Sequence, residues 1–467
     1  MKHILIIGGG TAGLAAAVTA AEAGADVTIL EKRKYLCGNG RYAEGMFAAG
    51  SRLQRRMNID VRPEEIFRKA MEFSHWRADA RLVRALIARS GETVDWLMDR
   101  GVPFTRLLHH MPNQTPEVFH MAYPAPTGLR VVSVLEERCR DLGVTIYTEA
   151  RARSLLRKNG AVVGVQAVVR GEGRDFQADA VLISTGGFAG NRELMRRMIP
   201  GCEPEAYAHL KGIAMEGDGL RMAEAAGADI PKDIAIEGCG PVYLGRWEIT
   251  GLIRRPDALW VNALGQRFCD ESICADFIFG QNAVARQPGQ MCWAILDAAG
   301  VRRAYEALPG SMAPLDADKN GMEHLYDALQ AEIEKGGVLR ADSIDALAEA
   351  AGIDPGALTA EVNAYNAACA AGRDDLFGKD GRCLQPLGEG PFYAVRAGMD
   401  IITTHGGIRV DSHMRVLTPA WKPIPGLYAA GIDISGVDSC DYSVDLSGHA
   451  FGFSVIGGRI AAEEMCK

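Results

Sequence analysis

The stretch ILIIGGGTAG, residues 4–13, decides the fold of the N-terminal part of this chain. A short run of β-branched residues at 3–7 leads into the pattern G-x-G-x-x-G, and the Ala-rich residues 14–24 follow as a predicted helix. A second strand is predicted over residues 26–31. Strand, glycine turn, helix and strand together make a βαβ unit of about 30 residues, which implies a parallel sheet.

The three spaced glycines of this turn have separate roles. Gly8 permits the tight turn, Gly10 lets the backbone approach a pyrophosphate, and Gly13 allows the helix to pack closely on the strand. The helix N-terminus offers free N–H groups and a positive dipole end to the phosphates. Glu31 ends the second strand, where a carboxylate accepts hydrogen bonds from ribose hydroxyls. These features together predict dinucleotide binding.

The residues beyond Glu31 favour FAD over NAD as the dinucleotide. A second glycine-rich loop at 36–45 suits a long ligand that runs over the sheet towards a flavin ring. Two more glycine turns end predicted strands, at 181–187 and 425–431. No second G-x-G-x-x-G follows a strand, so the sequence shows no NAD(P)H domain.

Bulk properties limit the classes of partner. The chain has 467 residues, which predicts two or three domains. Its formal net charge of −8 argues against nucleic-acid and anionic-membrane binding. We expect no membrane span, because no run of about 20 apolar residues occurs. The eleven cysteines form no C-x-x-C pair and no zinc spacing, and we see no signal peptide, so we expect reduced thiols in a cytoplasmic protein.

The order of elements indicates a nucleotide domain that is interrupted and then resumes. Helical patterns occupy residues 62–75, 80–100, 131–142, 322–335, 343–351, 355–371 and 448–465. Strands near 153–158 and 162–169 form a hairpin about Asn159-Gly160. Residues 102–128 are expected to be a loop. The pattern of predicted elements changes at about residue 236, and glycine-rich strand–turn patterns return at 403–411.

A series of short motifs runs in order through almost the whole chain. They are Gly8–Gly13, Glu31, Gly38-Asn39, Thr185-Gly186-Gly187, Gly217-Asp218-Gly219, Val261–Glu271, Tyr365–Gly378, Pro391–Ala394, Thr404–Gly407, Gly426–Gly431 and Gly458–Ala461. In this order they resemble the flavoproteins of the fumarate reductase/succinate dehydrogenase family, in the branch of soluble fumarate reductases and ketosteroid dehydrogenases.

The resemblance implies an α/β fold with a Rossmann-like FAD-binding domain of the glutathione-reductase type. That domain is split in sequence, over residues 1–235 and 403–467, and an α+β capping domain is inserted at 236–402. It also implies hydride exchange between flavin N5 and a carbon next to an electron-withdrawing group. The backbone N–H groups of 448–450 are expected to stabilise negative charge at flavin N1/O2.

The glycine motif and the resemblance together predict a non-covalent FAD site and no metal. The expected FAD-binding residues are Gly8, Gly10, Thr11, Ala12, Gly13, Glu31, Lys32, Gly38, Asn39, Gly40, Gly45, Thr185, Gly186, Asp218, His405, Gly406, Gly431, Ser447, Gly448 and His449. His109, His110 and His120 have no metal-ligand spacing.

The chain departs from the family at the positions that bind a dicarboxylate. The resemblance places Ala275 where fumarate reductases have the proton-delivering Arg, and Asp445 where they have a substrate-clamping Arg. Thr403 replaces a His, and Ile432, followed by Asp433, replaces a Glu. Without bidentate Arg partners, two substrate carboxylates are left uncompensated. We therefore expect neither fumarate nor succinate as the substrate.

Four residues are candidates for the chemistry. Tyr442 is expected beside the flavin, where a phenol donates a proton or polarises a carbonyl, although a packing role fits equally. His405 is expected to bond the flavin ring through its backbone, with its side chain facing the substrate. Asp445 binds a cationic or hydroxyl group, caps the last helix, or is simply exposed to solvent. Arg254 comes from the inserted domain and either faces the cleft or, with Arg255, forms a surface pair.

Glu271 is expected to be a structural partner of Arg267 in the inserted domain.

The function expected from these residues is reduction or formation of a C=C bond next to a carbonyl. The substrate is expected to be a small molecule such as an enone, a steroid-like or polyphenolic ring, or an aromatic acrylate. Two alternatives stay open, namely reductive loss of a ring hydroxyl or ether oxygen, and an electron-transfer flavoprotein without catalysis. No haem attachment motif is present, so electrons come from an external partner or reductant. The sequence does not indicate the oligomeric state.

Overall fold

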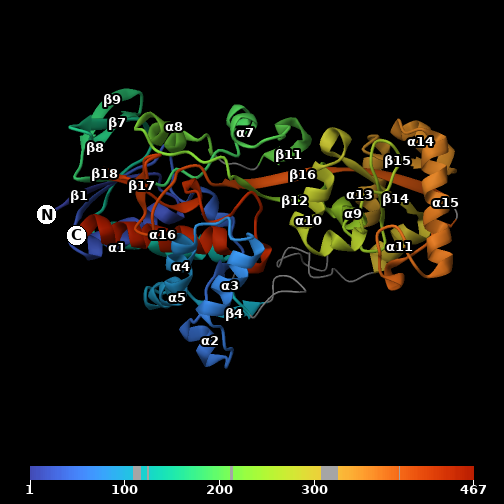
Figure 1. Ribbon diagram of the computed structural model, residues 1–467, viewed down its shortest axis with the longest axis horizontal. Helices are drawn as coiled ribbons and strands as arrows, with labels where there is room; N and C mark the ends of the chain where they lie inside the picture. The colour runs from blue at the N-terminus through green and yellow to red at the C-terminus, as the bar shows by residue number, and fades with distance from the viewer. Residues whose placement is uncertain (109–116, 124–125, 211–213, 307–323, 389) are drawn as a thin grey trace. The chain divides into compact units, whose positions relative to one another are not determined.

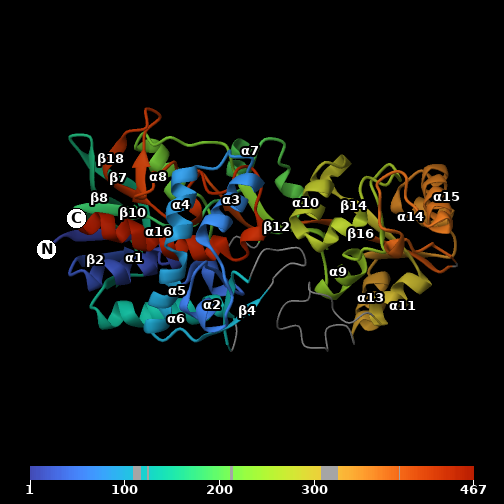
Figure 2. The same ribbon diagram turned by 60° about the horizontal axis from the view of Figure 1, so that its bottom comes forward.

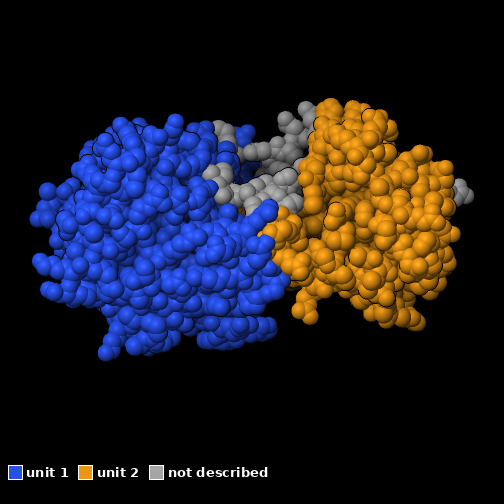
Figure 3. Space-filling view, turned by 90° about the horizontal axis from the view of Figure 1, so that it is seen from above, with its two compact units in different colours: residues 1–202, 212–237, 403–467 blue, residues 203–211, 238–402 orange. Residues whose placement is uncertain are grey.

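The computed structural model describes residues 1–108, 117–123, 126–210, 214–306, 324–388 and 390–467. Backbone contacts divide the chain into two compact units (Figure 3). Unit 1 consists of residues 1–202, 212–237 and 403–467, and unit 2 consists of residues 203–211 and 238–402. The assignment of unit 1 to FAD binding and of unit 2 to a capping role stays a prediction, and so do the domain boundaries expected from the sequence.

Unit 1 is built on a six-stranded sheet in the order β17-β18-β10-β1-β2-β6. Its strands are β1 His3–Ile7, β2 Asp26–Leu30, β6 Thr145–Tyr147, β10 Ala180–Ile183, β17 Arg415–Leu417 and β18 Pro423–Ala429. All neighbours are parallel except the edge pair β17–β18. The predicted parallel sheet is confirmed, and β1 reads as a continuous apolar run because both faces of a parallel sheet are buried.

The register of the sheet fixes where the glycine turns meet. Ile7 is paired with Leu30 on one side and with Ile183 on the other. The carboxyl ends of β1, β2 and β10 therefore lie at one edge, so Gly8, Glu31 and the turn after Ile183 are neighbours. In open α/β sheets this edge is where ligands bind.

Two helices pack against each other on this sheet. Helix α1, Thr11–Glu22, and helix α16, His449–Cys466, lie side by side in both ribbon views (Figures 1 and 2). A Cβ on Gly458 of α16 would lie 2.2 Å from the carbonyl oxygen of Ala12, so the two backbones are in direct contact. Helix α1 begins three residues earlier than position 14, because Gly10 is its N-cap.

Unit 1 also contains several shorter helices and smaller sheets. Its helices are α2 Arg52–Arg56, α3 Pro63–Phe73, α4 Ala80–Ala88, α5 Ser90–Asp99, α6 Thr127–Asp141, α7 Arg192–Met198 and α8 Asp218–Ala225. A second sheet contains β7 Ala150–Lys158, β8 Ala161–Val169 and β9 Glu172–Gln177. The predicted hairpin is confirmed, since Asn159 and Gly160 have φ of 52° and 83°, as a type I′ turn requires.

The expectation of a loop over 102–128 is wrong. Strands β4 Phe104–Leu108 and β5 Phe119–Ala122 pair with each other, and β5 also pairs with β3 Met46–Phe47. All four residues of β5 are buried, so the strand has no alternation of polar and apolar positions to reveal it. His109 and His110 lie outside the described residues.

Unit 2 is organised around the long strand β16, Phe392–His405, which continues into unit 1 at its end. It pairs with β11 Tyr207–Leu210, β12 Ala235–Tyr243, β14 Cys292–Asp297 and β15 Val338–Ala341, and β13 Leu259–Val261 pairs with β14. Its helices are α9 Trp247–Ile253, α10 Phe277–Ala285, α11 Ala298–Glu306, α13 Leu325–Glu334, α14 Ile344–Ala351 and α15 Pro355–Ala371. The expected α+β insertion is confirmed.

A buried ionic network stabilises unit 2. Glu271, which is fully buried, accepts hydrogen bonds from Arg267 Nε at 3.0 Å and Lys379 Nζ at 3.1 Å. Arg267 also donates to Asp374 at 3.0 Å. The predicted structural pairing of Glu271 with Arg267 is confirmed. None of the described helices combines the length and apolar character needed to cross a bilayer.

Candidate active site

The first glycine turn has the space and the donors that a pyrophosphate needs. Gly8 has φ of 105°, which a residue with a side chain rarely adopts. A Cβ on Gly10 would meet nothing within 4 Å, so open space lies in front of the α1 N-terminus. Glu31 holds the turn in place, because its carboxylate accepts hydrogen bonds from the N–H of Gly9 at 2.9 Å and of Arg33 at 2.8 Å.

The second glycine loop packs directly on the first. It forms a short 3-10 helix, Gly38–Tyr42. A Cβ on Gly40 would lie 1.8 Å from Thr11 Oγ1, and a Cβ on Gly45 would lie 2.4 Å from the Phe119 ring. Close packing therefore requires a glycine at 40, against the dinucleotide turn, and at 45, against the Phe119 ring. The geometry of both loops fits the FAD that the sequence predicts. The contacts of individual residues with FAD stay predictions.

The turn after β10 is held by a residue that the sequence analysis did not single out. Asp433 accepts hydrogen bonds from Thr185 Oγ1 at 3.1 Å, from Gly186 N at 2.7 Å and from Gly187 N at 3.1 Å. Thr185 Oγ1 in turn accepts a bond from Gly219 N at 3.0 Å. Asp433 was noted only as the neighbour of Ile432, and no local pattern links it to a turn so distant in sequence.

Two predicted cofactor residues form an ion pair with each other. Lys32 Nζ lies 2.8 Å from Asp218 Oδ2, and Arg151 lies 2.6 Å from the other oxygen of the same carboxylate. Burial alone would raise the pKa of Asp218, but the two cations outweigh burial and lower it. Asp218 is therefore ionised at the N-terminus of α8.

Four buried side chains and one half-buried glutamate gather in unit 1, and we call them the histidine cluster. They are Glu237, His405, Asp438, Tyr442 and His449. His405 ends β16 and precedes two glycines with φ of 120° and 131°, whereas His449 is the first residue of α16, after a glycine N-cap with φ of 78°. Predicted residues His405, Tyr442 and His449 are thus brought together. Glu237 and Asp438 were missed.

Hydrogen bonds run through this cluster without interruption. His405 Nε2 lies 3.0 Å from Glu237 Oε2, and its Nδ1 lies 3.0 Å from Asp438 Oδ2. His449 Nε2 lies 3.0 Å from Asp438 Oδ1, and its Nδ1 lies 3.0 Å from the Leu446 carbonyl oxygen. Asp438 therefore bridges the two imidazole rings.

The cluster perturbs the pKa values of its members. Burial works against a charged His405, but hydrogen bonds to Asp438 and Glu237 outweigh it and raise the pKa to about 9. Burial works in the opposite sense on Asp438, and the two histidines lower its pKa well below the usual value. Burial, with the carboxylates of Glu237 and Asp438 close by, raises the pKa of Tyr442 well above 10. Tyr442 is therefore a neutral phenol at physiological pH.

Ring packing fixes Tyr442 against both histidines. Its ring stacks on His449 with centroids 4.5 Å apart, and meets His405 edge-on at 5.0 Å. The phenol also hydrogen-bonds to Glu237, and the residue is 4% exposed. A stacked, hydrogen-bonded phenol has one orientation, which a proton donor requires.

The cluster also contains a set of potential metal ligands. Ligand atoms of His405, Asp438 and His449 all lie within 4.8 Å of one another. All four ring nitrogens, however, already have an oxygen acceptor at 3.0 Å. We therefore interpret the arrangement as a hydrogen-bonded network.

The loop before α16 places Asp445 in a short 3-10 helix, Val444–Leu446. Burial raises the pKa of Asp445, and Lys69 partly opposes this. The alternative that Asp445 caps the last helix is wrong. The N-cap residue of α16 is Gly448, and this helix has no side-chain cap hydrogen bond. Ser447 Oγ donates to the Val444 carbonyl at 2.8 Å. A role of Asp445 towards substrate stays a prediction.

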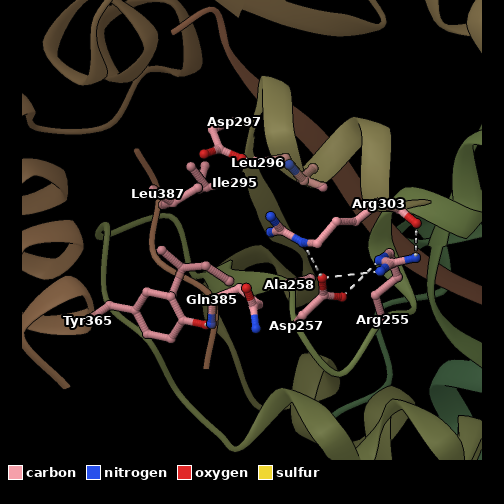
Figure 4. Close-up of a pocket in the computed structure, with 12 residues that line it drawn as sticks. Arg255, Asp257, Ala258, Ile295, Leu296, Asp297, Arg303, Tyr365, Gln385 and Leu387 are labelled. Carbon is pink, nitrogen blue, oxygen red and sulfur yellow. Dashed lines mark hydrogen bonds and ion pairs between the residues drawn. The ribbon is translucent and has the colours of Figure 1, made fainter. Parts of the chain in front are cut away.

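The inserted arginines lie in unit 2. Arg255 donates to Asp257 at 2.8 Å, and Arg303 donates to the same carboxylate at 3.0 Å, beside a small pocket (Figure 4). The Arg254 guanidinium lies 5.8 Å from the centre of the Phe277 ring. Arg254 and Arg255 are both half-buried, and both alternatives for them, a surface pair or a position facing the cleft, stay open. A role of Arg254 towards the substrate stays a prediction.

Comparison with known proteins identifies the family of this chain. A family profile described as "FAD binding domain" matches residues 3–441. The vinyl phenol reductase of Lactiplantibacillus plantarum is 31% identical over 98% of this chain and 94% of its own. The fumarate reductase (cytochrome) of Shewanella frigidimarina is 29% identical over 99% of this chain and 77% of its own.

The fold also matches solved structures. The 3-ketosteroid Δ1-dehydrogenase of Sterolibacterium denitrificans superposes with a TM-score of 0.78, covering all of both chains at 18% identity. The predicted family, the fold class and FAD as the cofactor are thereby confirmed, whereas the predicted absence of a covalent link stays a prediction. The chain belongs to the FAD-binding family of fumarate reductase/succinate dehydrogenase flavoproteins, and it is an FAD-dependent oxidoreductase acting on CH–CH groups.

Proposed function

We propose that this chain reduces a conjugated C=C bond in an aromatic or enone substrate that is not a dicarboxylate. The general activity, FAD-dependent reduction of activated C=C bonds, follows from the family of this chain and from its relatives. Similarity to the vinyl phenol reductase, which extends over nearly the full length of both chains, supports a vinyl arene as the first substrate class to test.

The observation that carries this proposal is the chemistry of the histidine cluster. Among the described residues, the hydrogen bonds and ion pairs of this cluster involve no lysine or arginine. Two acidic side chains, Glu237 and Asp438, lie there beside Tyr442. A substrate with two carboxylates needs bidentate cations, and buried carboxylates would repel it. A neutral conjugated substrate needs no such cations and is not repelled by the carboxylates.

Tyr442 is the proposed proton donor. When bound, reduced FAD supplies a hydride to one carbon of the double bond. Tyr442 supplies the proton to the neighbouring carbon from a phenol that burial keeps protonated. The stacking of Tyr442 on His449 holds the hydroxyl in one direction.

We further propose that FAD is bound without a covalent link. Cys37 is the cysteine that precedes the second glycine loop, at the start of the Gly38–Tyr42 helix. Burial raises the pKa of its thiol, with a smaller contribution from Glu136. A protonated thiol is a poor nucleophile towards a flavin ring. Acid precipitation is expected to release all of the flavin into the supernatant, and flavin retained in the pellet would overturn this.

The decisive experiment uses the FAD-loaded protein, reduced by dithionite without oxygen. Reoxidation of the flavin is followed after mixing with 4-vinylphenol, a hydroxycinnamate, a steroid enone or fumarate. We expect reoxidation by at least one of the first three, with the saturated product found by mass spectrometry, and none by fumarate. Fast reoxidation by fumarate alone would overturn the proposal. Loss of a ring oxygen in the product would favour the deoxygenation alternative instead.

A pair of variants tests the proton donor. Tyr442→Phe keeps the ring and removes the hydroxyl, so we expect kcat to fall about 100-fold or more with flavin content unchanged. Tyr428→Phe on β18 is the control, because this tyrosine lies outside the histidine cluster. Full activity of Tyr442→Phe would show that another group donates the proton.

A further inference from the structure

The oxygen atoms that face the histidine rings of the cluster indicate which ring nitrogens carry a hydrogen. Each ring nitrogen of His405 faces a carboxylate oxygen, and those of His449 face a carboxylate and a carbonyl oxygen. Carboxylate and carbonyl oxygens only accept hydrogen bonds. The His405 ring satisfies this pattern when both of its nitrogens carry a hydrogen. The resulting imidazolium cation faces the carboxylates of Glu237 and Asp438.

The same groups form a chain with one end closer to solvent. The side chains of His405, Asp438 and His449 are 6%, 4% and 1% exposed, whereas that of Glu237 is 18% exposed. Glu237 also accepts the hydrogen bond of the Tyr442 phenol. Glu237 is therefore the junction between water, His405 and Tyr442.

We propose that Glu237, His405, Asp438 and His449 form a proton relay that restores the proton of Tyr442 after each turnover. This inference rests on the proposed function, in which Tyr442 is the proton donor. Glu237 passes the proton, His405 stores it, and Asp438 with His449 are positioning residues that hold His405 in its charged, doubly hydrogen-bonded state.

The proton and charge balance of the step is complete. The Oη–H bond of Tyr442 breaks as the new C–H bond of the product forms, which leaves a tyrosinate, while the hydride and both electrons come from reduced FAD. His405 Nε2 then releases its proton to Glu237, and Glu237 passes it to the tyrosinate. His405 becomes neutral and keeps its Nδ1 hydrogen bond to Asp438. One proton from water enters through Glu237 and recharges His405.

A buried donor needs such a supply, because Tyr442 is 4% exposed and has little direct access to water. Ala275 stands where the resemblance places a proton-delivering arginine, so the route through that position is absent from this chain. The raised pKa of His405, about 9, keeps the stored proton available at physiological pH.

The first test compares two substitutions of Glu237 with a matched control. Glu237→Gln keeps size and hydrogen bonding but cannot carry a proton, whereas Glu237→Asp can. We expect kcat for Glu237→Gln to fall about 10- to 100-fold, with KM within about threefold, and Glu237→Asp to recover part of the loss. The control is His120→Gln, a buried histidine of unit 1 that bonds to Ser51 and lies outside the cluster. Its kcat should change little.

The pH profile supplies a readout that a purely structural role would not move. In the unchanged protein, kcat should be constant at neutral pH and fall as His405 loses its proton near pH 9. The groups that face His405 are Glu237, Asp438, Tyr442 and His449. Removing the charge of Glu237 removes one of the two contacts that raise the His405 pKa, so the falling limb should move to lower pH. An unmoved limb would contradict the relay.

A second measurement needs no variant and covers the case in which Glu237→Gln does not fold. Steady-state rates in mixtures of H₂O and D₂O should give a curved proton inventory, because more than one proton moves in the relay. A straight line would mean a single transferred proton and would overturn the relay.

The outcomes separate this inference from the proposed function. If Tyr442→Phe is inactive and Glu237→Gln keeps the normal kcat and pH profile, the relay is wrong and the proposed function stands. If no C=C substrate reoxidises the reduced protein, both are wrong. If the purified protein contains one metal ion per chain and chelation abolishes activity, His405, Asp438 and His449 form a metal centre and the relay is wrong.

Discussion

His405 lies between two carboxylates, and this position links its protonation to folding. The pKa of a histidine is about 6.5 in an unfolded chain, and that of His405 is raised to about 9 in the folded protein. A raised pKa stabilises the fold fully below pH 6.5, and the stabilisation declines as pH rises and is lost above about pH 9. We expect this term to reach about 2–4 kcal/mol.

Urea unfolding of the FAD-loaded protein at pH 6 and pH 10 tests this prediction. The free energy of unfolding should be larger for the unchanged protein than for His405→Gln at pH 6, and this difference should shrink by about 2–4 kcal/mol at pH 10. A difference that is the same at both pH values would contradict the assignment of a charged His405.

Asp433 is expected to control the occupancy of the cofactor site. Its carboxylate accepts three hydrogen bonds from the turn Thr185–Gly187. Asp433→Ala leaves these donors without their acceptor, at a cost of about 1–3 kcal/mol for each buried donor that water cannot reach. The ratio of flavin to protein absorbance should fall and the thermal midpoint should drop. Asp433→Asn keeps one acceptor oxygen and should be intermediate. Full flavin content in Asp433→Ala would refute this role.

Single residues of the site were predictable only where a local pattern marks them. The glycines of 8–13 and the acid Glu31 follow a spacing that depends on one βαβ unit. His405 and Tyr442 were singled out as separate residues. Glu237 was missed, because it meets His405 across 168 residues and nothing near it in sequence indicates that contact. Chemistry that depends on distant segments meeting is not encoded in a local spacing.

At the level of elements, the contact between α1 and α16 gives a sharp prediction. A Cβ on Gly458 would lie 2.2 Å from the backbone oxygen of Ala12, which is so close that one of the two backbones must shift. Overpacking of this kind costs about 1–3 kcal/mol, and here the dinucleotide turn is displaced with α1. Gly458→Ala should therefore lower both the thermal midpoint and the flavin content.

The neighbouring glycine is a matched control. A Cβ on Gly457 would meet Met414 Sδ at 3.5 Å and Ala430 Cβ at 3.6 Å, which are ordinary contacts. Alanine also has the higher helix propensity, by about 1 kcal/mol. Gly457→Ala should be neutral or stabilising in the same thermal unfolding assay. Equal loss of flavin in both variants would show that the α1–α16 contact is not the cause.

Elements with their own boundary signals were predicted well. The expected range 355–371 is the observed range of α15, since Asp354 caps it, Pro355 begins it and Gly372 ends it with φ of 65°. Strand β5 was missed, although it is fully buried, because it has only four residues and is defined by the partners on both sides. Pairing between distant strands, rather than local propensity, determines such short elements.

At the scale of the whole molecule, a substitution that destabilises unit 2 is expected to leave flavin binding by unit 1 unchanged. Glu271 accepts hydrogen bonds from Arg267 and Lys379 at the centre of unit 2, with all three side chains at most 2% exposed. Glu271→Gln leaves Arg267 with Asp374 as its described carboxylate partner and removes the carboxylate that is paired with Lys379. Removing one partner of a buried ion pair costs about 3–5 kcal/mol. The glycine loops that are predicted to bind FAD belong to unit 1, so we expect flavin binding to survive this substitution.

Limited proteolysis of the FAD-loaded protein checks this last prediction, with flavin absorbance recorded on the same samples. In Glu271→Gln, cleavage within residues 238–402 should become much faster while flavin absorbance is retained. The control is Asp375→Asn, which breaks an exposed pair with Arg373 and should change neither quantity. If flavin were released at the same rate as unit 2 is cleaved, the two units would unfold as one, and the FAD loops would depend on the Glu271 network after all.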